Sequence, residues 1–157
     1  MSGFGKIVIA TDKFKGSMTA VQASEAVRDG ITEGCKEAGR TMPQILLRPM
    51  ADGGEGSMGV MERALRESGI GYRKEFIPTV NHLGSQILAP VLLYGAEDGT
   101  SRAFVEMASV CGLNMIPRER RNLLRSTTYG LGTVLRECIE SHGVREILLA
   151  IGGRGGH

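Results

Sequence analysis

KIVIATDKFKGS, residues 6–17, is the stretch of sequence that decides the fold. Its first part, residues 6–10, is a continuous apolar run that predicts a strand, and the polar segment 11–17 predicts a loop. Thr19 and Gln22 have the spacing of a capping box, which predicts that a helix begins there. Apolar residues then recur every three or four positions, at Ala20, Ala23, Val27 and Ile31. The stretch therefore predicts a strand, a loop and an amphipathic helix in that order.

The same order recurs further along the chain. Gln44–Leu47 predicts a strand, residues 51–56 form a glycine-rich turn, and a helix follows with Met58, Met61 and Leu65 on its buried side. Two successive units of this kind predict parallel strands. We therefore expect an α/β fold with a doubly wound, Rossmann-like parallel sheet.

The middle of the chain has a different pattern. Three strand-like segments, residues 72–80, 86–94 and 102–107, follow one another without helices, and Glu97-Asp98-Gly99-Thr100 has the composition of a hairpin turn. This predicts an antiparallel or mixed sheet from a second α/β domain. We expect residues 1–70 to belong to the first domain and residues 71–157 to the second.

The last part of the chain returns to helix and strand. Leu131, Val134, Leu135, Cys138 and Ile139 mark a third helix, which stops at Gly143 as a C′ residue. Residues 145–151 then predict a last buried strand.

Composition favours a small-molecule partner. The chain of 157 residues has a formal net charge of only +2 and scattered basic residues, so we expect no nucleic acid polymer and no membrane as a partner. Its three cysteines lack the spacing of a disulfide framework or a zinc site. The apolar run at the N-terminus is too short for a signal peptide. We expect a cytoplasmic protein.

The strongest candidate for chemistry is the segment Met50–Gly56, with sequence MADGGEG. It follows a strand and precedes a helix, where unpaired backbone N–H groups and glycines suit a phosphate or another anion. Asp52 is a candidate Mg²⁺ ligand, or the acceptor of a proton from a substrate hydroxyl. The structural alternative is a glycine turn in which Asp52 is the helix N-cap.

Two further loops carry candidate residues. Asp12, Lys15, Gly16 and Ser17 follow the first strand, and Lys15 could neutralise a phosphate, although surface lysines are common. Thr127, Thr128 and Gly130 precede the third helix and suit either an anion or simple capping. Within the basic segment 118–125, only Arg125 is retained as a candidate for binding an anionic substrate.

The ordered motifs resemble those of type I glycerate kinases. They are Asp12-x-Phe14-Lys15-Gly16-Ser17, Ala51-Asp52-Gly53-Gly54-Glu55-Gly56, Glu106-Met107-Ala108 with Gly112-Leu113, Thr127-Thr128-x-Gly130-x-Gly132, and Ile151-Gly152-Gly153. Together they cover nearly the whole chain, which is similar to the N-terminal part of the family. After Gly153 the family continues with Ser, Ala, Thr, Asn, Asp and two glycines, whereas this chain ends at His157.

The resemblance implies transfer of the ATP γ-phosphoryl group to glycerate, with Mg²⁺, giving 2-phosphoglycerate. It implies that Asp12, Lys15 and Asp52 are catalytic, and that the following residues bind substrate or nucleotide: Gly16, Ser17, Gly53, Gly54, Glu55, Gly56, Glu106, Arg125, Thr127, Thr128, Gly130, Gly152 and Gly153.

Because family members are considerably longer, we expect a truncated form with little activity on its own. We also expect it to form a homo-oligomer through an uncovered sheet surface. The alternative is a noncatalytic, anion-binding α/β protein derived from a glycerate kinase.

Overall fold

The computed structural model describes residues 5–96, 98–116 and 126–152. The chain forms two compact units, Met1–Ala51 and Asp52–His157. The helix that follows the second strand belongs to the second unit, so the units divide earlier in the chain than the predicted domain boundary at residues 70/71. Compact units of one chain and the domains of a longer protein need not coincide, and the domain boundary stays a prediction.

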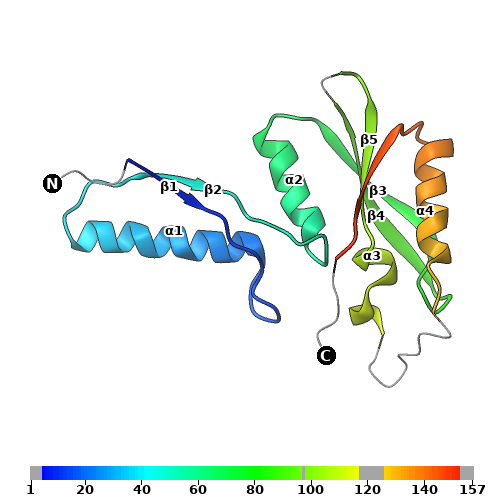
Figure 1. Cartoon of the computed structure of the whole chain (residues 1–157), viewed down its shortest axis with the longest axis horizontal. Helices are drawn as coiled ribbons and strands as arrows, with labels where there is room; N and C mark the ends of the chain where they lie inside the picture. Colours follow the sequence, from blue (N-terminus) through cyan, green and yellow to red (C-terminus); the bar gives the residue numbers. More distant parts are fainter. Residues whose placement is uncertain (1–4, 97, 117–125, 153–157) are drawn as a thin grey trace. The chain divides into compact units, whose positions relative to one another are not determined.

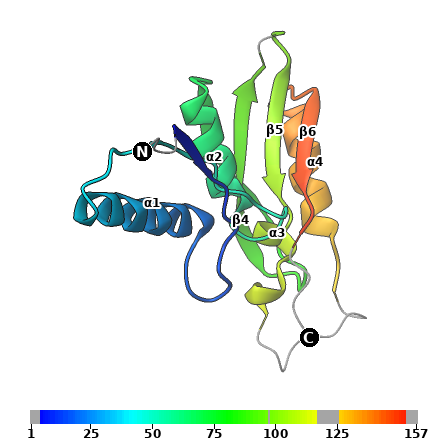
Figure 2. The ribbon, with the colours of Figure 1, turned by 60° about the vertical axis from the view of Figure 1, so that its left-hand side comes forward.

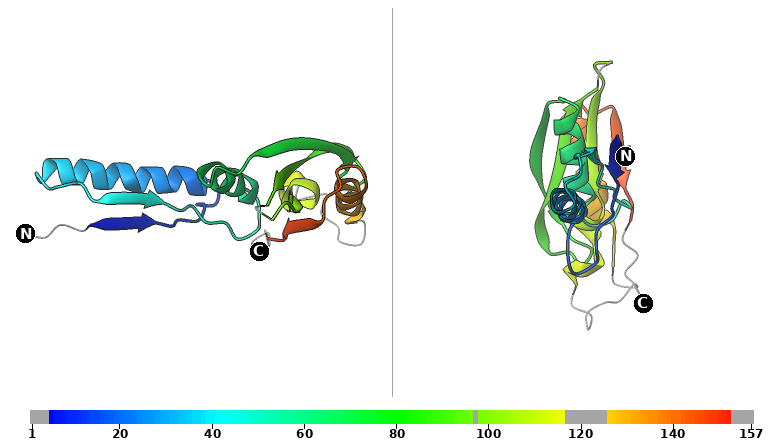
Figure 3. Two further views of the ribbon diagram at one scale, coloured as in Figure 1. Left: turned by 90° about the horizontal axis from the view of Figure 1, so that it is seen from above. Right: turned by 90° about the vertical axis from the view of Figure 1, so that its left-hand side faces the viewer.

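The first unit is a parallel strand pair with one long helix. β1 (Lys6–Ile9) pairs with β2 (Gln44–Leu47) in parallel, and α1 (Ala20–Glu37) connects them and runs along the pair (Figure 3). The predicted parallel arrangement is confirmed. The helix begins where the capping box predicts, because Gln22 N donates to Thr19 Oγ1 at 3.2 Å and Thr19 N donates to Gln22 Oε1 at 2.9 Å.

The predicted apolar stripe of α1 is only partly buried. Ala20 and Ala23 are in the core, but Val27 is 43% exposed. The two strands are four residues each. A pair that short covers only the first turns of an eighteen-residue helix, so the periodicity predicted a longer buried face than this unit provides.

The second unit is built on a four-stranded mixed sheet with the order β3-β4-β5-β6 (Figure 1). β3 (Tyr72–Val80), β4 (Gln86–Gly95) and β5 (Ser101–Glu106) are antiparallel neighbours, and β6 (Glu146–Ala150) pairs with β5 in parallel. The β4–β5 hairpin is closed by a bond from Ala96 N to Thr100 O at 2.9 Å. The α/β fold class and the mixed middle segment are therefore confirmed.

Helices cover parts of both faces of this sheet. α2 (Ser57–Glu67) packs on one face, while α3 (Ala108–Cys111) and α4 (Tyr129–Glu140) pack on the other (Figures 1 and 2). The α2 face is made by Met58, Leu65, Leu92, Phe104 and Ala150. On the α4 face, Val91, Val105, Val134 and Cys138 are completely buried. The prediction that the last strand is buried is only partly right, since Leu148 in β6 is 53% exposed.

α4 ends at Glu140 with Ser141 as its C-cap residue, so it stops before Gly143, where the sequence predicted its end. Gly143 has a φ of 64°, and Val144 N donates to Cys138 O at 3.0 Å. The left-handed conformation of Gly143 is one that glycine adopts without strain.

The connection from β5 to β6 determines which ends of these two strands lie together. It passes through α3, the short 3₁₀ helix η1 (Leu113–Met115) and α4 before β6 returns parallel to β5. The carboxyl ends of both strands therefore lie at the same edge of the sheet, where Glu106 pairs with Ala150. Ligand sites of open α/β sheets lie at this edge.

Candidate functional site

The loop Asp52–Gly56 precedes α2 and is held by hydrogen bonds between its backbone and nearby side chains. Gly54 N donates to Asp52 Oδ1 at 2.9 Å, and Ser57 Oγ donates to Gly54 O at 2.6 Å. Gly56, with a φ of 93°, is the N-cap residue of α2. The alternative in which Asp52 caps α2 is therefore wrong. Asp52 is instead exposed at the surface of this unit.

Glu106 binds the first turn of the helix that this loop begins. It is the last residue of β5 and only 5% exposed, and its Oε2 accepts a hydrogen bond from Met58 N at 2.8 Å. A carboxylate at a helix N-terminus is stabilised by the unpaired N–H groups and the helix dipole. The structure thus connects two of the predicted motifs directly.

Gly152 and Gly53 bring a third motif to the same place. A Cβ atom on Gly152 would lie 2.2 Å from Gly54 N and 2.5 Å from Asp52 O. A Cβ on Gly53, whose φ is 84°, would lie 3.3 Å from the backbone of Ile151. The segment after β6 therefore packs backbone to backbone against the loop, and these glycines are required by the close approach.

A further contact to this loop comes from a residue that the sequence did not suggest. Asn114 Nδ2, in η1, donates to Glu55 Oε2. No spacing marks Asn114 as functional, and the hydrogen bond joins positions 59 residues apart. Only the folded structure shows this contact.

We name the set formed by the loop Asp52–Gly56, Glu106, Asn114 and Gly152 the β5/β6 edge site. It holds three carboxylates, of which Glu106 is buried and Asp52 and Glu55 are exposed. Among the described residues, no group of three or more His, Cys, Asp or Glu side chains is placed to hold a metal ion.

The loop Asp12–Ser17 belongs to the first unit and is mostly exposed. It folds on itself, since Phe14 N donates to Met18 O at 2.9 Å and Ser17 N donates to Phe14 O at 2.9 Å. Gly16 has a φ of 77°, and no heavy atom lies within 4 Å of the position that a Cβ would take there. Lys15 is exposed.

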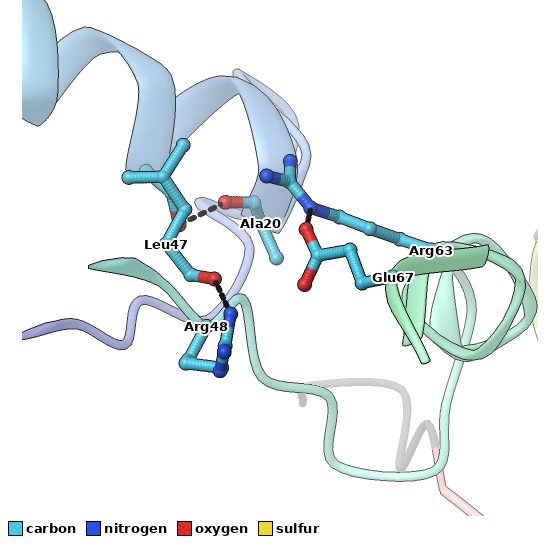
Figure 4. Close-up of polar contacts among 6 residues, drawn as sticks. Ala20, Leu47, Arg48, Arg63 and Glu67 are labelled. Carbon is cyan, nitrogen blue, oxygen red and sulfur yellow. Dashed lines mark hydrogen bonds and ion pairs between the residues drawn. The ribbon is translucent and has the colours of Figure 1, made fainter. Parts of the chain in front are cut away.

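The carboxyl ends of β1 and β2 leave the sheet side by side. Arg48 N donates to Ile9 O at 2.7 Å, and Met50 N donates to Thr11 O at 2.9 Å. The Arg48 guanidinium donates to Leu47 O at 2.9 Å at the end of β2 (Figure 4). The loops that carry Asp12 and Asp52 are thus continuations of neighbouring parallel strands, as the sequence predicted.

At the start of α4, Thr128 is the N-cap residue without a side-chain cap, and Tyr129 N donates to Thr127 Oγ1 at 3.1 Å. Thr127 N also donates to His82 O at 3.0 Å. Gly130 packs on β3, because a Cβ there would lie 1.7 Å from Val80 O. Both threonine side chains are exposed, so this segment has hydroxyl groups available for a ligand.

His82 is a buried histidine that the sequence pattern did not single out. It is 4% exposed, and neither ring nitrogen has a hydrogen-bond partner. Burial lowers the pKa of His82 below its ordinary value. The ring is therefore held in its neutral form near the backbone that anchors Thr127.

A groove of about 450 Å³ lies between β3 and α4, with Thr79, Tyr129 and Thr133 among its lining residues. It does not include the β5/β6 edge site. Two of the predicted site residues, Arg125 and Gly153, lie outside the described residues.

Comparisons with known proteins agree on one family. The model of the glycerate kinase family matches residues 7–156. A glycerate kinase from Halalkalibacterium halodurans is 40% identical over 149 residues, which is 94% of this chain and 35% of that protein. Glycerate 2-kinase from Escherichia coli is 33% identical over 148 residues, which is 94% of this chain and 35% of that protein.

A solved structure shows the same similarity. A crystal structure from Salmonella typhimurium LT2, assigned as a glycerate kinase 2, superposes with a TM-score of 0.65 at 30% identity. The alignment covers 94% of this chain and 36% of that one. The chain thus spans about a third of the length of the relatives it matches.

Proposed function

The chain belongs to the glycerate kinase family, and on that premise we propose that it acts in the ATP-dependent phosphorylation of glycerate to 2-phosphoglycerate. The observation that carries this proposal is the β5/β6 edge site. Three motifs far apart in the sequence meet there at the carboxyl edge of parallel strands, through the Glu106 bond to Met58 and the packing of Gly152 on the loop.

Phosphoryl transfer depends mostly on positioning and on neutralising charge, and the loops carry the groups that this requires. Asp52 is proposed as a Mg²⁺ ligand or as the acceptor of the glycerate hydroxyl proton. An exposed carboxylate on a loop fixed by several contacts suits both roles. When bound, Mg²⁺ would neutralise charge on the nucleotide phosphates.

The other site residues are proposed as follows. Lys15 supplies a positive charge for a phosphate, Asp12 assists catalysis, and Gly16 and Ser17 bind ligand through the first loop. Around the β5/β6 edge site and the start of α4, the proposed binding residues are Gly53, Gly54, Glu55, Gly56, Thr127, Thr128, Gly130 and Gly152. Exposed hydroxyl groups and close-packed glycines favour contacts with phosphate or carboxylate oxygens.

Association and location are also proposed. Leu88 and Leu148 are 62% and 53% exposed on strands of the sheet. Apolar side chains in such positions favour self-association, so we propose a homo-oligomer, which sedimentation velocity would detect. No helix in the described ranges is long and apolar enough to cross a bilayer. A cytoplasmic location is our proposal, since glycerate and ATP are its proposed partners.

The test is turnover of isotope-labelled ATP with glycerate, with calorimetric titration of Mg·ATP and of glycerate in parallel. The chain as it stands and the same chain with Asp52→Asn are compared, with Glu146→Gln as a control for removal of an exposed carboxylate that pairs with Arg102.

We expect the chain to bind Mg·ATP and glycerate, and we expect this binding to weaken in the Asp52 variant but not in the Glu146 control. We expect little turnover by this chain alone. Turnover above the rate without enzyme that is lost in the Asp52 variant would favour a catalytic role, whereas binding with no turnover at all would favour the noncatalytic alternative. The absence of any binding of either ligand would contradict the proposal.

A further inference from the structure

Helix α2 begins without a capping side chain of its own. Its N-cap is Gly56, it has no side-chain cap bond, and its first turn contains no acidic residue. The first N–H groups of a helix have no partner within the helix, and leaving them unpaired in a buried position is costly. Both Ser57 and Met58 are buried. Helix α2 therefore depends on an acceptor from elsewhere.

Glu106 is that acceptor for Met58 N, from a position 48 residues away in the sequence. A carboxylate that is only 5% exposed is expensive to bury unless charge-stabilising partners surround it. The N-terminus of a helix provides such partners, and a hydrogen bond to a charged group is stronger than one between neutral groups. The geometry thus accounts for both the buried carboxylate and the uncapped helix.

Resting on the proposed function, we infer that Glu106 is a positioning residue that occupies the anion-binding position at the start of α2. Its carboxylate fixes the first turn of α2 and, through that turn, the loop that carries Asp52. Because the carboxylate already occupies Met58 N, a ligand phosphate binds other groups of the site. A phosphate at Met58 N would meet a carboxylate of the same charge already in place.

The neighbouring contacts support this role. Ser109 Oγ donates to Glu106 O at 2.7 Å, and Met107 N donates to Ala150 O at 3.0 Å. The backbone that carries Glu106 is therefore fixed between β5 and β6. A side chain mounted on a strand end held in this way can set the position of a loop.

The experiment uses amide hydrogen exchange on the chain without ligands, read at Met58 and at Val134 in α4 as an internal reference. In Glu106→Ala we expect exchange at Met58 to rise by about tenfold or more, the scale of a lost charged hydrogen bond, while Val134 changes little. Formate, a small carboxylate, should then restore protection at Met58 in this variant and have no effect on the native chain.

The control and the second variant keep the inference falsifiable. Glu146→Ala removes a carboxylate from the neighbouring strand and should show neither the increase nor the formate effect. Glu106→Gln keeps the shape of the side chain and one acceptor oxygen but removes the charge. It should lose part of the protection at Met58, and it tests the inference even if Glu106→Ala fails to fold.

Two results would overturn the inference. The first is an exchange rate at Met58 in Glu106→Gln equal to that of the native chain. The second is a loss of protection at Met58 in Glu106→Ala that formate does not restore, since a packing role would not respond to a free carboxylate. Because no substrate is present, this readout is independent of whether the chain binds ATP or glycerate.

Discussion

The loops Asp12–Ser17 and Asp52–Gly56 look alike in sequence but are held in different ways. Both follow strands of one parallel pair, and both combine aspartate with glycine. The first loop is closed by its own backbone and leaves open space around Gly16. The second is packed against Gly152 and connected to Glu106 through the first turn of α2. In the first loop glycine is therefore needed only for its backbone conformation, whereas in the second it is needed for close packing.

The largest difference between the loops should appear in catalysis. In a full-length relative, Asn at the position matching Asp52 should lower turnover by about 100-fold or more, roughly 3 kcal/mol of transition-state stabilisation. Asn at the position matching Asp12 should cost less, because a carboxylate on a loosely packed loop is less precisely positioned. Steady-state kinetics with glycerate would check both, and an unchanged rate for the Asp52 variant would exclude the base and metal roles.

The next effect is on stability at the β5/β6 edge site. Gly152→Ala should destabilise the second unit by about 2–3 kcal/mol, because its Cβ would overlap backbone atoms that cannot move separately. Gly59→Ala is the matched control, since no atom lies within 4 Å of its added Cβ in α2. It should be neutral or stabilising by about 1 kcal/mol. Urea unfolding measures both, and equal stabilities would refute close packing at Gly152.

A smaller effect is expected in the other loop. Gly16→Ala should cost about 1 kcal/mol, because its φ of 77° is strained for a residue with a Cβ although there is space for one. Gly16→Asn should cost less, since asparagine tolerates this conformation better. Thermal unfolding of the two variants would check this order. If Gly16→Asn were the less stable variant, the space for a side chain, rather than the backbone conformation, would limit which residues position 16 accepts.

The smallest effect concerns the segment at the start of α4. The buried His82 has a pKa below its ordinary value of 6.5, so the unfolded chain binds a proton more readily than the folded one. Stability should therefore fall as the pH is lowered through about 6.5. His82→Leu should reduce this dependence. Urea midpoints of the native chain and the variant at pH 7.5 and 5.5 measure it, and the same change in midpoint with pH in both proteins would contradict the assignment.

Much of the fold could be read from local patterns. The capping box at Thr19 and the strand Gln44–Leu47 are where the sequence predicts them. Local sequence specifies these features because they depend on bonds between near neighbours. The exposed Val27 shows the limit of periodicity. A pattern identifies a helix face that could be buried, but only the partner element decides how much of it is covered.

The candidate site divides in the same way. The sequence by itself determined which loops carry carboxylates, glycines and hydroxyl groups, and the order of those motifs is specific enough to indicate the family. Only the tertiary structure decided that Glu106 binds Met58, that Gly152 packs on Gly54, and that Asn114 reaches Glu55. These contacts join residues tens of positions apart, and they exist because parallel β5 and β6 end at one edge of the sheet. No local propensity encodes such a meeting, since it follows from strand order and from the crossover between the strands.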